Sequence, residues 1–162
     1  MNPNGYATDN PIPESFAAIL VSLEKAVKKL LKASMKQGKV YIITNAAEGW
    51  VEFSARKYMP SIYSLLSKIE IISARTKYEV LYPGNYYEWK INAFLETLDE
   101  LELGAVTNLV ALGDSNIEME AVKHLASKFP RALLKTVKFR EIPTPEELVK
   151  QITLVTERFE QI

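Results

Sequence analysis

The sequence predicts an α/β fold, a Rossmann-like parallel sheet of about four strands with helices on both faces. Short apolar segments rich in β-branched residues alternate with longer segments whose apolar residues recur at three- and four-residue steps. One apolar run, residues 106–112, passes through the polar turn 113–116, GDSN, directly into a helical pattern. A strand that leads through a tight turn into a helix is the unit from which parallel sheets are built. No internal repeat interrupts the alternation, so we expect one domain over residues 1–162.

Composition narrows the classes of function. The chain is 48% hydrophobic and 25% charged, which excludes a largely disordered protein. Twenty basic residues balance twenty acidic ones, so no nucleic acid or membrane surface is expected as a partner. The absence of cysteine and the single histidine, His124, exclude thiolate catalysis, zinc–thiolate sites and histidine clusters. We find no secretory signal and no run of about 18 apolar residues, so a cytoplasmic protein is expected.

The first third of the chain begins with a loop and continues as a long helix. Residues 1–13 contain three prolines and cannot supply a strand. From Phe16 onward, apolar residues follow the spacing of an amphipathic helix, which Gly38 ends. The polar face of this helix carries a lysine cluster that is usually a solvated surface, formed by Lys25, Lys28, Lys29 and Lys32.

Four strands and the remaining helices follow in alternation. The strands are expected at residues 39–44, 69–72, 106–112 and 132–137, with 106–112 buried on both faces. Helical patterns cover 48–67 with a break at Pro60, the segment that begins at Lys90, the segment after Ser115, and the segment that begins with the capping box Thr144-Pro145-Glu146-Glu147. An aromatic loop is expected at 82–89, packing against the next helix. Residues 46–89 are too few for a large cap domain, and we expect a short helical and aromatic insertion.

The turn after residues 106–112 holds a carboxylate pair, Asp114 and Glu118. Open α/β sheets bind ligands at the carboxyl ends of their strands, and paired carboxylates suit a hard cation such as Mg²⁺. Aspartate and serine are also preferred N-cap residues, and a glutamate in the first turn suits the helix dipole. From this turn alone, a metal site and simple helix capping are equally good interpretations.

Polar side chains follow one another at strand ends and helix starts in a particular order, namely Thr44, Asn45, Lys90, Asp114 and Glu118. A hydroxyl and an ammonium suit phosphate oxygens, and the two carboxylates suit Mg²⁺. Over residues 39–137 this order resembles the haloacid dehalogenase-like (HAD) superfamily, mostly phosphatases and phosphotransferases, whose later motifs are matched by VYIITNA, YEWKINAFL and LVALGDSNIE. VYIITNA and VALGDSNIE look most like uncharacterised members from plants and protists. The resemblance implies phosphate binding by Thr44, Asn45 and Lys90, and Mg²⁺ binding by Asp114 and Glu118.

The chain departs from that superfamily at the first motif, an Asp-x-Asp at the end of the first strand, whose first aspartate is the nucleophile. The only aspartates here are Asp9, Asp99 and Asp114. Asp9 lies in the proline-rich loop and Asp99 on a helix flank, so neither matches the nucleophile. We therefore expect the chain as given to be inactive in phosphoryl transfer and to bind Mg²⁺ weakly.

The first strand of the superfamily, which lies between the strands matched here by 39–44 and 106–112, has no counterpart either. Its loss would leave two rows of backbone groups without partners. We consider three outcomes: the two strands pair directly, a segment of another chain fills the slot as in a strand-swapped homodimer, or a longer natural form supplies the strand upstream of Met1. The sequence favours the third.

Three functions follow as hypotheses. The first is a phosphatase-like scaffold without its nucleophile. The second is a truncated form of an active Mg²⁺-dependent phosphatase, and the third is a non-enzymatic α/β interaction protein in which Thr44, Lys90 and Asp114 are only capping residues. The absence of a large cap suits a phosphoprotein or another bulky substrate. Arg75 and Lys138, each after a strand, could bind anions near the same edge or could be ordinary surface charges.

Overall fold

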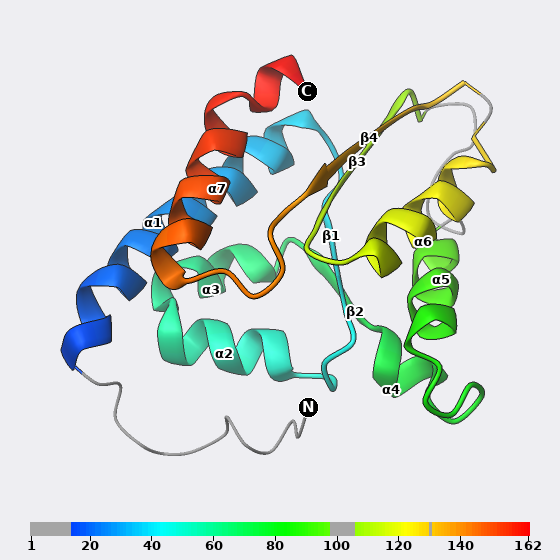
Figure 1. Ribbon diagram of the computed structural model, residues 1–162, viewed down its shortest axis with the longest axis horizontal. Coiled ribbons are helices and arrows are strands. Elements are labelled where there is room, and N and C mark those ends of the chain that lie inside the picture. The colour runs from blue at the N-terminus through cyan, green and yellow to red at the C-terminus, as the bar shows by residue number, and fades with distance from the viewer. Residues whose placement is uncertain (1–13, 98–105, 130) are drawn as a thin grey trace. The chain divides into compact units, whose positions relative to one another are not determined.

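The computed structural model describes residues 14–97, 106–129 and 131–162, and Figure 1 shows its helices and strands. Its helices are α1 Glu14–Gln37, α2 Trp50–Tyr58, α3 Pro60–Leu66, α4 Ala74–Tyr78, α5 Tyr86–Glu96, α6 Asn116–Ala126 and α7 Pro145–Glu157, followed by the short 3-10 helix η3 Phe159–Gln161. Its strands are β1 Tyr41–Thr44, β2 Glu70–Ser73, β3 Asn108–Gly113 and β4 Leu133–Lys138. The expected loop at 1–13, with Asp9, and the helix flank with Asp99 lie outside the described residues.

The chain divides into two compact units, each built from separate stretches of sequence. Residues 14–42, 46–71 and 143–161 belong to the first unit. Residues 43–45, the described residues between 72 and 142, and Ile162 belong to the second. The expectation of a single domain over residues 1–162 stays a prediction.

The first unit is organised around α1, which packs along α7 and also contacts α3 (Figure 1). Apolar residues at helical spacing place Ala26 and Leu30 on the buried face of α1. A second apolar cluster joins Ala55, Ile62 and Leu66 from α2 and α3. The predicted break between these two helices is confirmed, because Pro60 opens α3 where its missing N–H costs nothing.

The predicted capping box at the start of α7 is confirmed. The Thr144 hydroxyl accepts the Glu147 N–H at 3.2 Å, and the Glu147 carboxylate accepts the Thr144 N–H at 2.9 Å. Each side chain thus satisfies a backbone donor that the helix itself cannot pair.

The second unit contains the parallel pair β3–β4, with α6 packed on both strands, α5 packed on α6, and α4 packed on α5. The N–H of Leu133 donates to the carbonyl of Thr107 at 2.8 Å, and the N–H of Phe139 donates to the carbonyl of Gly113 at 2.7 Å. With Leu109 opposite Leu134, odd-numbered residues of β3 turn their backbone groups toward β4. The backbone groups of Asn108, Val110 and Leu112 therefore point to the other edge of β3.

The α/β class is confirmed, whereas a single four-stranded sheet stays a prediction. Among the described strands, β1 pairs with β2 and β3 pairs with β4, and no ladder joins the two sheets. Direct pairing of β1 with β3 is thus not seen in the part of the chain that the structure describes. The prediction that β3 is buried on both faces was wrong. Of its six residues only Ala111 is buried, and Val110 is 40% exposed, because an apolar run alone does not reveal how many strands flank it.

The start of α5 also differs from the prediction. The helix begins at Tyr86, and Lys90 lies in its second turn. The side chain of Asn85 caps the helix by accepting the N–H of Glu88 at 3.2 Å, a local signal that the aromatic content of this stretch obscured. Trp89 belongs to the helix and is 1% exposed.

Candidate functional site

The side chain of Lys90 is the centre of the candidate site. It lies on α5 and is 4% exposed. Its ammonium donates to the carbonyl of Ile43 at 2.7 Å, next to Thr44 at the carboxyl end of β1. It also forms an ion pair with Glu118 of α6, with 3.2 Å between Nζ and Oε1. Through this one side chain the second unit connects the end of β1, α5 and the first turn of α6.

Both oxygens of the Glu118 carboxylate have partners. Oε1 faces Lys90, and Oε2 accepts the backbone N–H of Ser115 at 3.1 Å and also the Ser115 hydroxyl. The Ser115–Glu118 contact is the capping-box arrangement at the start of α6. The helix-capping interpretation therefore describes what Glu118 does within the described chain.

The close approach of α6 to β3 explains why the strand ends in glycine. A Cβ on Gly113 would lie 2.9 Å from the Cβ of Glu118 and 3.3 Å from the Cε of Met119. Glycine at this position lets the first turn of α6, and with it the Glu118 carboxylate, lie against the end of the strand.

Burial and pairing shift both titratable groups of the ion pair. Burial lowers the pKa of Lys90, and the charges of Glu118 and Asp114 only partly oppose this effect. Burial alone would raise the pKa of Glu118, but the hydrogen bond from Ser115 and the charge of Lys90 together hold it below its ordinary value. An ammonium has three donors, and within the described ranges the Ile43 carbonyl and Glu118 account for two of those of Lys90.

The remaining predicted residues differ in their surroundings. Thr44 and Asn45 are partly buried at the end of β1. The Oδ1 atom of Asn45 is buried and accepts no hydrogen bond from the described chain, which is an energetic cost unless a ligand or ion satisfies it. Asp114 is exposed in the turn after β3, and its charge reaches Lys90 electrostatically.

These residues fit a Mg²⁺ ion only in part. Within the described ranges no three His, Cys, Asp or Glu side chains come together as a metal site. Both oxygens of Glu118 are already engaged, which leaves the carboxylate of Asp114 as a charged ligand and Asn45 Oδ1 as a neutral one. Mg²⁺ can complete its shell with water, but one carboxylate holds it weakly.

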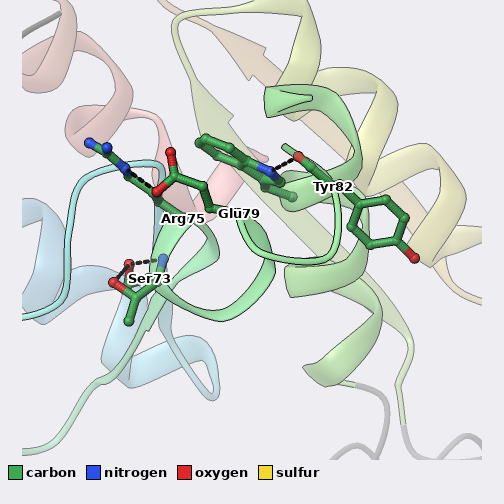
Figure 2. A network of polar contacts seen from close by, with 6 residues as sticks. Ser73, Arg75, Glu79 and Tyr82 are labelled. Atoms are coloured by element: carbon green, nitrogen blue, oxygen red, sulfur yellow. Dashed lines mark hydrogen bonds and ion pairs between the residues drawn. The ribbon is translucent and has the colours of Figure 1, made fainter. Parts of the chain in front are cut away.

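Arg75 and Lys138, the two further candidates for anion binding, already have carboxylate partners. Figure 2 shows Arg75 on α4, where its Nε donates to Glu79 Oε2 at 2.9 Å, and this hydrogen bond raises the pKa of Arg75. Lys138 likewise pairs with Glu141 at 3.0 Å. Both cations are therefore neutralised locally on the surface of the second unit.

Figure 2 also shows two local contacts that shape the segment between β2 and α5. The hydroxyl of Ser73 accepts the N–H of Thr76 at 3.0 Å and so caps α4, where the sequence suggested only the end of a strand. The indole N–H of Trp89 donates to the carbonyl of Tyr82 at 2.6 Å.

Two partners in the site were not predicted, namely Ser115 for the Glu118 carboxylate and the carbonyl of Ile43 for Lys90. The spacing Ser115-x-x-Glu118 is a capping-box signal and could have assigned the Glu118 carboxylate to Ser115. No local signal could have found the carbonyl of Ile43, because it meets Lys90 across 47 residues of sequence.

Comparison with protein-family models, with curated proteins and with solved structures found no match. The resemblance over residues 39–137 therefore rests on the motifs themselves. None of the helices in the described ranges is both long enough and apolar enough to cross a bilayer.

Proposed function

We propose that this chain is a phosphatase-like α/β scaffold, similar to the HAD superfamily, that binds a phosphate group and does not transfer it. The observation that carries the proposal is the buried ammonium of Lys90, held at the end of β1 by the Ile43 carbonyl and Glu118. A lysine that is fixed by two acceptors and keeps one free donor is pre-organised for an anionic oxygen.

The groups around Lys90 suit an oxyanion that either carries a hydroxyl of its own or binds together with a cation. The third donor of Lys90 would meet a phosphate oxygen. The hydroxyl of Thr44 is at the end of β1, and the amide of Asn45 follows directly after it. The unpaired Oδ1 of Asn45 would accept from a phosphate hydroxyl or contact Mg²⁺. Bound Mg²⁺ would offset phosphate charge, with Asp114 as its carboxylate ligand.

The lack of catalysis follows from the composition of the site. Transfer through a covalent intermediate needs a nucleophile, and the sequence contains no Asp-x-Asp. Asp114 follows β3, where the resembled superfamily places a metal ligand. The second candidate is a truncated form of an active Mg²⁺-dependent phosphatase. The edge of β3 that pairs with no described strand supports it, because such an edge would accept a further strand.

The expected partners follow from the same features. An uncapped site suits a phosphoprotein or another bulky phosphorylated ligand. The edge of β3 that has no partner among the described strands suits strand exchange in a homodimer. A cytoplasmic location stays a prediction. If neither phosphate nor a further strand binds, the chain is better described as an α/β interaction protein in which Glu118 only caps α6.

Residue-resolved titration with inorganic phosphate tests the proposal. In ¹⁵N-resolved NMR spectra, we expect phosphate to shift the amide signals of Thr44, Asn45 and Lys90, and to leave those of Arg75 and Glu79 unchanged. An aryl phosphate with Mg²⁺ should show no turnover, and Asp114→Asn should behave in the same way. Turnover that Asp114→Asn abolishes would overturn the non-catalytic assignment, and phosphate shifts confined to surface lysines would overturn the binding site.

A further inference from the structure

Helix α1 carries a row of exposed lysines along one face, which we call the α1 lysine stripe. It consists of Lys25, Lys29, Lys32 and Lys36, with Lys28 half-buried beside it. The spacing of four, three and four residues keeps the four exposed ammonium groups on one side of the helix, over about 16 Å of its axis. The opposite face, with Ala26 and Leu30, is buried where α1 packs in the first unit.

The described chain supplies no counter-charge to this stripe. None of its lysines has a carboxylate oxygen within 4.0 Å among the described residues. The helix has five lysines against two glutamates, and Glu24 is directed away to accept the N–H of Ser61. Other exposed lysines of this chain do have partners, such as Lys77 with Glu96 and Lys123 with Glu120.

We infer that the α1 lysine stripe binds an acidic segment of another protein whose carboxylates repeat at a similar spacing. Charge complementarity is the basis, because several uncompensated positive charges in a line attract a line of negative ones. The surface lies in the first unit, so the inference is independent of the candidate phosphate site in the second unit.

The composition of the stripe favours an acidic protein segment over the two other polyanions. It contains no arginine for paired contacts with phosphates and no aromatic ring for stacking on bases. The nearest exposed apolar side chain on the same face is Val21, which is 49% exposed. One valine provides too little apolar surface to insert into a bilayer. The chain as a whole carries no net charge, so a long nucleic acid or a charged membrane would also approach its acidic groups.

The experiment measures binding of the full chain to a fluorescent helical peptide with glutamates at positions i, i+4, i+7 and i+11. The test variant is Lys25→Gln/Lys29→Gln/Lys32→Gln, which neutralises three charges with little change in helix propensity. The matched control is Lys68→Gln/Lys128→Gln/Lys150→Gln, which neutralises three exposed lysines outside α1. Single-stranded DNA and vesicles containing phosphatidylserine are the competing probes.

We expect the peptide to bind at low salt, to be released by added salt, and to lose about tenfold in affinity with the test variant only. An equal loss in both variants would show that only net charge matters and would overturn the inference. Absence of peptide binding, or tighter binding of the DNA or the vesicles through the same lysines, would overturn it as well. Circular dichroism of both variants checks that α1 is still folded.

Discussion

The ammonium of Lys90 lies 3.2 Å from the carboxylate of Glu118, although the two residues belong to different helices of the second unit. The lysine is almost completely buried, while the Glu118 side chain is 17% exposed. Lys90 also donates to the Ile43 carbonyl, and Glu118 also accepts the Ser115 N–H. A buried pair with these further partners fixes one geometry, and its loss on one side leaves an unpaired buried charge.

Lys90→Met should therefore lower the free energy of unfolding by about 2–4 kcal/mol, because Glu118 keeps a partly buried charge without its partner. Glu118→Gln alone leaves the buried ammonium of Lys90 uncompensated and should cost a similar amount. In the double variant neither charge remains. Its loss of unfolding free energy should therefore be smaller than the sum of the losses of the two single variants. Urea unfolding of all four proteins gives the coupling energy. Costs that simply add would show that the pair contributes nothing.

Acid should weaken the fold through Glu118. Because the folded state holds the pKa of Glu118 below its ordinary value of about 4.3, the ionised group stabilises the fold above that value. The contribution is lost as the pH falls through the lowered pKa. The stability of the wild type should thus fall more steeply than that of Glu118→Gln below about pH 4.3. Thermal unfolding as a function of pH measures both slopes, and parallel slopes would contradict the assignment.

At alkaline pH, the titration of Lys90 should change the stability of the fold. Burial lowers the pKa of Lys90 in the folded state, so the unfolded chain binds the proton more tightly. Between the lowered pKa and the ordinary lysine value of about 10.4, this group makes the fold more stable as the pH rises. Lys90→Met lacks the titrating group and should lack this gain. The difference in unfolding free energy between the two proteins, followed over the alkaline range, is the measurement.

Gly113→Ala should destabilise the protein by about 1–3 kcal/mol, because the new Cβ would lie 2.9 Å from the Cβ of Glu118. The clash would also move Glu118 away from Lys90. Gly38→Ala is the matched control, since a Cβ there meets no atom within 4 Å. Chemical denaturation compares the two variants, and equal stabilities would show that α6 can withdraw from β3 without cost.

Thr144→Ala should cost about 1 kcal/mol of stability, because it leaves the N–H of Glu147 without its side-chain acceptor. The control is Thr153→Ala, an exposed position within α7, where alanine is a better helix former. Thermal unfolding should therefore separate the two variants in opposite directions. A neutral Thr144→Ala would mean that water replaces the cap fully.

Local signals account for the features that could be predicted correctly. Pro60 ends one helix and opens the next through its own ring, and Thr144 and Glu147 cap α7 with groups three residues apart. Such signals act within one turn, so neighbouring residues alone reveal them. The start of α5 has a local signal too, the Asn85 cap, although the prediction began the helix at Lys90, four residues after its observed start at Tyr86.

The candidate site could be predicted only as a set of residue types in order. Thr44, Lys90, Asp114 and Glu118 have side chains that suit phosphate and Mg²⁺. The structure brings Lys90 to Glu118 and to Ile43, the neighbour of Thr44. It also commits Glu118 to Ser115 and leaves Asp114 exposed. These assignments depend on which side chains compete for each hydrogen bond, and spacing along the chain does not determine that.

By itself the sequence determined the α/β class, the amphipathic face of α1, the helix break at Pro60 and the absence of an Asp-x-Asp nucleophile. Each of these follows from periodicity, from one residue or from composition. Only the tertiary structure decided that Lys90 is buried against Ile43 and that β3 pairs on one edge alone among the described strands. Burial and strand pairing arise from contacts between residues far apart in the chain, and their free energy depends on three-dimensional packing.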